Sequence, residues 1–236
     1  MAKAQFSGAF ANVILTQLSQ SRLADIRQHL EPVALEIKKV IYEPNQRAQH
    51  AYFVEIGMIS IVSLMKDGSS IEVGTIGKEG MAGCFLLLGT DTVPYQYFVQ
   101  MAGHGHRMEA QKFRDAADRD GEFRKLILKY LSVLQTQTMQ GAACNGLHSI
   151  TQRCCRWVLM SQDRMDSDTI ALTHEFLGLM LGVRRASVSE VLRPLQDRGW
   201  IESKRGEITI LDRKGLESGT CECYRIIADQ QKKLIA

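Results

Sequence analysis

Residues 172–192 read LTHEFLGLMLGVRRASVSEVL, and this stretch is the most informative about the fold of the C-terminal part. Its first half places Thr173, a residue type that caps helix N-termini, directly before an apolar helical face. Gly182 interrupts the helical pattern and supplies a turn. A second apolar stripe, with i, i+3, i+4 and i+7 spacing, runs from Val188 to Leu195. The stretch therefore predicts two short helices joined by a glycine turn.

The opposite face of the second helix is polar and begins with Arg184 and Arg185. Two arginines at a helix N-terminus oppose the helix macrodipole, so an anion or a guanine edge is the expected neighbour, although two solvated arginines are the alternative. Gly178 lies inside the first helix, where it weakens the helix, and this indicates a close crossing of the second helix. Pro194 predicts either a kink in the second helix or an end one turn earlier.

A short hairpin follows this helix pair. Arg198-Gly199 ends the helix, residues 200–203 and 207–211 have strand patterns, and Lys204-Arg205-Gly206 forms the turn. A basic hairpin after a helix-turn-helix predicts a winged helix that binds duplex DNA, with base edges read by the second helix and phosphates held by the first helix and the wing. The residues expected to contact DNA are Thr173, His174, Arg184, Arg185, Ser187, Ser189, Glu190, Arg193, Lys204 and Arg205.

The region before residue 110 has a different pattern. Residues 12–31 have helical spacing up to Pro32, and short apolar strands follow to about Met108, with breaks at Gly57, Gly77 and Gly103–Gly105. Many short strands joined by glycine turns predict an antiparallel sandwich or barrel. The fold class is therefore α+β.

The segment from Gln111 onward returns to helical spacing. Its apolar and small residues alternate at intervals of four and three, which is typical of a coiled-coil seam. A helix that packs on its own β domain would give a similar pattern. The residues expected at a dimer interface are Ile127, Leu131, Leu134, Thr138, Gly141 and Asn145.

The composition is that of an ordinary globular protein of 236 residues, with 45% hydrophobic and 23% charged residues and a net charge of +3. No apolar run is long enough to span a membrane, and no signal peptide is evident, so a cytoplasmic location is expected. The six cysteines are expected to be reduced thiols. No Ser-His-Asp, P-loop or paired-carboxylate pattern appears, so no catalytic residue is predicted.

With these motifs, the chain resembles the CRP/FNR family of transcription regulators over nearly its whole length. The most specific stretch is Leu172–Ile201, and Tyr52–Gly57 and Gly77–Leu88 match more loosely. The resemblance implies a jelly-roll-like β-roll effector domain over 1–110, a dimerisation helix over 111–147 and a winged helix-turn-helix domain over 148–236. It also implies a homodimer that binds a palindromic operator and has RNA polymerase as a partner.

The chain departs from cyclic-nucleotide-binding members of that family. The residues that match their phosphate-binding cassette, a candidate effector pocket, are Gly80, Gly83, Cys84 and Phe85. Cys84 stands where the ribose-binding glutamate would be, and Asp91 is the only formally charged residue from Gly80 through His106. A buried cyclic phosphate would lack a cationic partner, so cyclic AMP is not expected to act here. No cofactor is predicted, and the effector, either a small molecule or none, stays open.

Two further departures concern other contacts. Ala186 and Glu190 replace an acidic residue and an arginine that are common in the family, so the base preference should differ. No cysteine precedes Cys84, so the iron–sulfur cluster of FNR-type sensors is not expected.

The remaining cysteines offer an alternative reading. Cys144 and His148 share a helical face, and Cys154-Cys155 and Cys221-Glu222-Cys223 add thiols, so a zinc or redox site is the alternative to inert buried cysteines. The spacing matches no familiar zinc template, and inert cysteines are the expectation, with no metal site. The alternative function is a β-roll metal-binding protein, thiol redox sensor or enzyme with an incidental helical tail.

Overall fold

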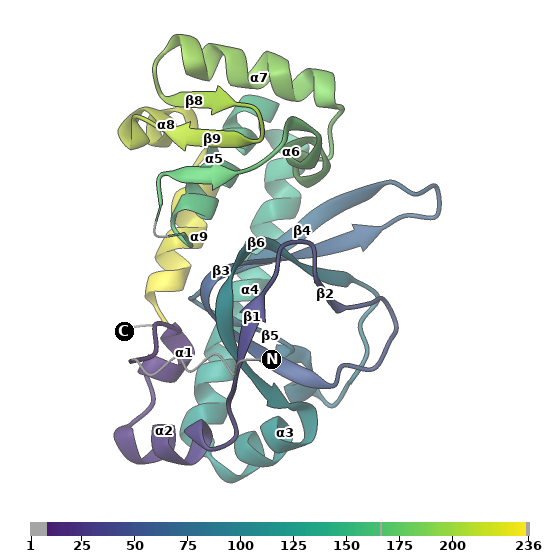
Figure 1. Ribbon diagram of the computed structural model, residues 1–236, viewed down its shortest axis with the longest axis vertical. Helices are drawn as coiled ribbons and strands as arrows, with labels where there is room; N and C mark the ends of the chain where they lie inside the picture. Colours follow the sequence, from purple (N-terminus) through teal and green to yellow (C-terminus); the bar gives the residue numbers. More distant parts are fainter. Residues whose placement is uncertain (1–8, 166, 235–236) are drawn as a thin grey trace.

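The computed structural model describes residues 9–165 and 167–234. Figure 1 shows the β-rich N-terminal part in the lower half of the view and the smaller, mostly helical C-terminal part above it. The long helix α4 (Gly121–Leu147) runs between them behind the sheet. Within the described residues, no helix combines the length and the apolar character needed to cross a membrane.

The N-terminal part is built on one six-stranded antiparallel sheet, which confirms the predicted β-roll and the α+β class. The central path runs β1-β6-β3-β4, with β2 on β6 and β5 on β3. The strands are β1 (Glu31–Leu35), β2 (Val40–Tyr42), β3 (His50–Leu64), β4 (Ser70–Ile76), β5 (Met81–Ala82) and β6 (Gln96–Glu109), with a short 3-10 helix η1 (Cys84–Leu88).

The expected strand breaks at Gly57 and at Gly103–Gly105 are wrong, because β3 and β6 run through these glycines. The two strands pair over most of their length, with irregular register near Ile56 and Met58. A Cβ atom at Gly103 would overlap the carbonyl oxygen of Ile56, and one at Gly105 would overlap that of Phe53. These glycines permit close approach of two backbones instead of ending a strand.

Five helices flank or follow the sheet: α1 (Val13–Thr16), α2 (Gln20–Arg27), α3 (Ala110–Arg119), α4 and α5 (Ile150–Gln162). The helical pattern expected to end at Pro32 is two helices that end earlier, and Pro32 itself lies in β1. The helical segment from Gln111 is also divided, at Asp120. The Asp120 carboxylate accepts hydrogen bonds from the backbone N–H groups of Glu122 at 2.9 Å and Phe123 at 3.3 Å and so caps α4.

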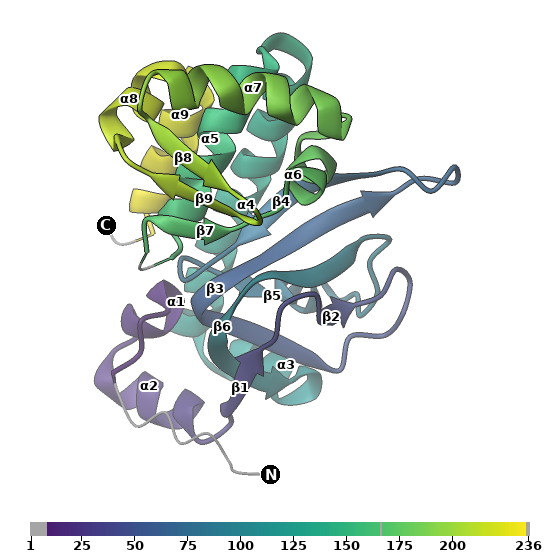
Figure 2. The same ribbon diagram turned by 45° about the horizontal axis from the view of Figure 1, so that its top comes forward.

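The C-terminal part carries a three-stranded antiparallel sheet in the order β7-β9-β8 and a set of short helices. Figure 2 shows α7 above this sheet, with α5 and α9 behind it. The elements are β7 (Thr169–Ala171), α6 (His174–Leu181), α7 (Arg185–Asp197), β8 (Ile201–Lys204), β9 (Glu207–Ile210), α8 (Arg213–Gly219) and α9 (Glu222–Lys232).

The two parts are packed against each other. Met58 and Phe98, from β3 and β6, belong to the apolar core of the C-terminal part, and the Phe98 ring lies 5.9 Å from that of Phe176. Polar contacts also cross this boundary. The Arg164 guanidinium, whose side chain is only 2% exposed, pairs with the Glu79 carboxylate at 2.6 Å. These contacts fix the position of the helix-turn-helix relative to the sheet.

Candidate nucleic-acid interface

Helix α6 and its turn have the geometry that the sequence predicts. The Thr173 hydroxyl accepts a hydrogen bond from the backbone N–H of Phe176 at 3.1 Å, which caps the helix. Gly182 has φ of +64° at the helix end, a conformation that favours glycine. A Cβ atom at Gly178 would lie 2.9 Å from the carbonyl oxygen of Val183, so this glycine lets the chain turn back closely toward α7.

Helix α7 has a buried apolar side and an exposed polar side. The buried residues are those of the predicted stripe: Val188, Val191, Leu192 and Leu195. Arg184, Arg185, Ala186, Ser189, Glu190 and Arg193 are exposed, and Ser187 is half-buried.

Pro194 does not end the helix one turn early, since α7 continues to Asp197. The proline is on the exposed side, where water can serve the backbone carbonyl that loses its partner. The helix instead ends in a Schellman motif at Gly199. There, the N–H groups of Gly199 and Trp200 donate to the carbonyls of Gln196 at 2.8 Å and Leu195 at 3.0 Å.

The hairpin β8-β9 forms the predicted wing, and Gly206 turns it with φ of +83°. The wing has a third strand that the sequence does not predict, because β7 pairs with β9. A strand of three residues carries too little alternation to be recognised from sequence.

His174, at the start of α6, connects this helix with α7 and with strand β8 of the wing. Its ring lies 3.2 Å, through Nδ1, from the Ser189 hydroxyl of α7 and 3.1 Å, through Nε2, from the Ser203 hydroxyl of β8. Both ring nitrogens are thus engaged inside the protein. His174 is predicted to touch phosphates, and within the protein its two contacts also hold Ser189 and the wing in position.

These residues surround one open groove of about 450 Å³. Three of its lining side chains are cationic and one, Glu175, is anionic. Gln196 and Ser203 also line the groove but were not predicted, because neither residue type signals a contact without the fold. The lining residues are Thr173, His174, Glu175, Arg185, Gln196, Ser203, Lys204, Arg205 and Gly206.

The predicted DNA-contact residues therefore divide into two sets. The groove brings together Thr173, His174, Arg185, Lys204 and Arg205. Arg184, Ser187, Ser189, Glu190 and Arg193 lie along α7 outside its lining.

The predicted dimer seam does not lie on one exposed face of α4. Ile127 is completely buried in the core of its own chain, and Leu134 is half-buried against that core. Thr138, Gly141 and Asn145 line a cavity of about 180 Å³ between α4 and the C-terminal part. The large apolar side chains exposed on α4 are Leu128, Met139 and Leu147, at 45%, 63% and 82%.

Aromatic side chains of the protein pack directly against the glycines of the candidate effector pocket. The Tyr130 ring of α4 lies where a Cβ atom on Gly80 would be, and the Tyr42 hydroxyl oxygen would lie 2.6 Å from a Cβ atom on Gly83. Cys84 and Phe85 are 4% and 7% exposed. Burial raises the pKa of the Cys84 thiol to about 12, so this thiol is neutral at physiological pH.

The β-roll, the long helix and the winged helix together define a two-part winged-helix protein. Residues 152–218 match the family model of the Crp-like helix-turn-helix domain. A comparison with curated protein sequences gives no match.

Several solved structures share the fold of most of this chain. FixK2 from Bradyrhizobium japonicum superposes with a TM-score of 0.69 at 16% identity, over 81% of this chain and 98% of FixK2. A CRP-family transcriptional regulator from Thermus thermophilus gives 0.65 at 21% identity, over 80% of this chain and 95% of that one. The c-di-GMP-responsive global regulator CLP from Xanthomonas campestris gives 0.64 at 18% identity, over 81% and 99%.

The chain thus carries a Crp-like helix-turn-helix domain and shares its fold with structures described as transcriptional regulators of the CRP/FNR and CRP families. The resemblance inferred from the sequence is confirmed.

Proposed function

We propose that this protein binds palindromic duplex DNA as a homodimer, with α7 of each subunit in the major groove of one half-site. The observation that carries the proposal is the groove between α6, α7 and the wing, which gathers Arg185, Lys204 and Arg205 on one surface. An α-helix fits the major groove of B-DNA, and the flanking cations then lie near the phosphates. The proposal includes RNA polymerase as the partner and the cytoplasm as the place of action.

The two groups of polar residues have different tasks in this proposal. Arg185, Ser189 and Glu190 read bases: Arg185 pairs with guanine, and Glu190 accepts from cytosine or orients Arg185. Thr173, Lys204 and Arg205 contact phosphates, which position the protein without reading sequence. The +3 net charge makes this local arrangement of cations more important than the charge of the whole chain.

The substitutions Arg185→Ala and Arg205→Ala separate these tasks. Arg185→Ala should weaken binding to a selected duplex by about 1–3 kcal/mol and change binding to a scrambled duplex little. Arg205→Ala should weaken both equally and reduce the salt dependence by about one phosphate contact. Titrations at several salt concentrations measure both effects, and equal losses on both duplexes for Arg185→Ala would remove that residue from the major groove.

The exposed side of α4 supports the dimer. Leu131 follows Leu128 by three residues, and Met139 follows it by eleven. This spacing puts the three side chains on one face of the helix, whereas Ile127 faces the core. We therefore place the dimer contact on this face, which shares Leu131 with the seam predicted from sequence but leaves out the buried Ile127.

Mass measurement at micromolar concentration tests the dimer face. Leu128→Asp with Met139→Asp should give a folded monomer, since both side chains are exposed in the single chain. The control is Leu211→Asp, which alters a leucine that is 60% exposed on the C-terminal part and should leave a dimer. A dimeric double variant would refute this face.

The β-roll supports DNA binding that does not depend on cyclic AMP. The Tyr130 ring packs against Gly80 of the cassette, and the sequence from Gly80 to Gln100 contains no Lys or Arg that could pair with a cyclic phosphate. Calorimetry with cyclic AMP should show no binding at micromolar concentrations. A micromolar or tighter dissociation constant would refute this part of the proposal.

A further inference from the structure

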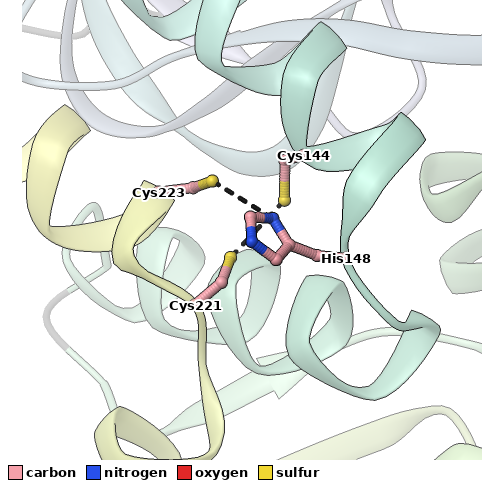
Figure 3. Close-up of side chains that lie close together, drawn as sticks. All are labelled: Cys144, His148, Cys221 and Cys223. Atoms are coloured by element: carbon pink, nitrogen blue, oxygen red, sulfur yellow. Dashed lines mark hydrogen bonds between the residues drawn. The ribbon is translucent and has the colours of Figure 1, made fainter.

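Four metal-ligating side chains from distant parts of the chain converge beside the long helix. Cys144 and His148 come from the C-terminal end of α4, and Cys221 and Cys223 come from the start of α9. Their four ligand atoms all lie within 4.8 Å of one another. Figure 3 shows the three sulfur atoms grouped around the imidazole ring.

The three thiols are buried as a cluster of their own. Cys144, Cys221 and Cys223 are 0%, 5% and 0% exposed, and they belong to neither of the two large apolar cores. Cys154 and Cys155 differ, since both pack inside the core of the C-terminal part among aliphatic and aromatic side chains. The expectation of inert cysteines therefore suits Cys154 and Cys155 but does not explain why three thiols and an imidazole are grouped together.

The distances suit one tetrahedral ion. Ligand atoms about 2.0–2.3 Å from zinc at tetrahedral angles are about 3.4–3.8 Å apart. The Cys144 and Cys221 sulfur atoms are 3.5 Å apart, and the Cys223 sulfur lies 3.5 Å from His148 Nδ1. Small movements of the side chains would bring the remaining pairs to the same separation.

The neighbours of the cluster are those of a metal site. The second imidazole nitrogen, His148 Nε2, lies 3.3 Å from the Glu222 carboxylate, which is the usual outer partner of a zinc-bound histidine. The Gln140 side-chain amide donates to the Cys223 sulfur at 3.1 Å and would stabilise a thiolate there. Cys221 is the N-cap of α9, where the helix dipole favours negative charge.

We propose that Cys144, His148, Cys221 and Cys223 bind one structural Zn²⁺ ion. Three thiolates and an imidazole fill the four positions of a tetrahedral ion, so no position stays open for water or substrate, and the site is structural instead of catalytic. Binding releases the thiol protons to solvent and involves no oxidation or reduction.

The ion would attach the C-terminal helix to the long helix. Cys223 and Ile227 are the buried residues of α9, and the ion would add bonds between this helix and α4 to that packing. Zinc bound between α9 and the end of α4 joins the C-terminal part to the helix that carries the proposed dimer face. The site does not depend on DNA binding, and its test is independent of that proposal.

Metal analysis of the full-length protein, purified without a metal-affinity tag or chelator, tests the proposal. We expect one zinc ion per chain, and Co²⁺ exchanged into the site should give the visible spectrum of a tetrahedral thiolate complex. X-ray absorption at the zinc edge should show three sulfur ligands and one nitrogen ligand. This measurement uses the unaltered chain, so it stands even where a cysteine variant fails to fold.

Variants identify the ligands. His148→Ala, at a side chain that is 18% exposed, should stay folded and weaken zinc binding at least about 100-fold in competition with a chromophoric chelator. Glu222→Gln should weaken it about tenfold. The matched controls are Asp229→Asn on the same helix and Cys84→Ala in the β-roll, which should both keep one zinc ion.

Three results would overturn the proposal. The first is folded protein without stoichiometric zinc that also fails to bind Co²⁺. The second is a Cys144–Cys221 disulfide in protein purified without added oxidant, which would make the cluster a thiol switch. The third is iron with inorganic sulfide in place of zinc.

Discussion

Glu72 provides a pH-dependent test of how the two parts of the protein are joined. Its carboxylate lies between the sheet and α5, where it accepts hydrogen bonds from the Ser60 hydroxyl at 2.7 Å and from Trp157 Nε1 at 2.9 Å. Burial raises the pKa of Glu72 from its ordinary value of 4.5 to about 7, and the two hydrogen bonds offset only part of this rise. Between pH 4.5 and about 7, Glu72 of the folded protein therefore holds a proton that it releases in the unfolded chain.

The sign and size of the effect follow from this difference in pKa. Between pH 4.5 and about 7 the folded state binds more protons at Glu72 than the unfolded state, so the free energy of unfolding falls as pH rises. The stabilising contribution is complete below pH 4.5 and is lost above about 7. At about 1.4 kcal/mol for each pH unit, the whole loss is about 3 kcal/mol.

Urea denaturation of the wild-type protein and Glu72→Gln between pH 5 and 8.5 measures this loss. Glutamine keeps an acceptor for Trp157 and an amide that can donate to the Ser60 hydroxyl, but it carries no charge. We expect similar stability at pH 5 and a variant more stable by about 2–3 kcal/mol at pH 8. The exposed Glu36→Gln is the control and should change the free energy of unfolding little at any pH. A difference between wild type and Glu72→Gln that does not vary with pH would refute the reasoning.

Three further substitutions, two of them with a matched control, test other contacts. Glu79→Ala leaves Arg164 buried without its ion-pair partner and should lower the free energy of unfolding by about 3 kcal/mol, whereas Glu31→Ala, which breaks an exposed pair with Arg107, should cost less than about 1 kcal/mol in the same urea titration. Gly103→Ala should force β3 and β6 apart and lower the free energy of unfolding by more than about 3 kcal/mol. Its control, Gly68→Ala, has open space around its Cβ and should cost only the strain of its positive φ, about 1 kcal/mol. Equal losses of stability for the two variants would contradict the close approach of the two strands at Gly103. His174→Ala should weaken binding to a selected duplex about tenfold by releasing Ser189 and the wing, and unchanged affinity would show that these two hydrogen bonds do not position the site.

The helix-turn-helix could be predicted from sequence because its signals are local. The cap at Thr173, the turn at Gly182 and the buried stripe from Val188 to Leu195 each depend on residues a few positions apart. Pro194 could not be resolved in the same way. Its cost depends on whether water can reach the freed carbonyl, and this depends on which side of the helix is exposed.

Features that depend on distant residues were not predictable. Gly103 and Gly105 look like strand breaks until β3 is known to lie against them. Ile127 and Leu128 are neighbours on α4, but the first is buried and the second is exposed. Only packing against the sheet determines that Ile127 faces inward. Cys144 and Cys221 are 77 residues apart, so no spacing rule connects them before the chain folds.

Selection of duplexes from a random pool by the wild-type protein tests the central claim most directly. The proposed homodimer predicts enrichment of an inverted repeat, with half-sites about one helical turn, or 10–11 base pairs, apart. The selected duplex should bind about 10³-fold or more tightly than a scrambled one at physiological salt, and the affinity should fall steeply as salt rises. Enrichment of no sequence, or of a single motif without inverted symmetry, would contradict DNA reading by a pair of α7 helices.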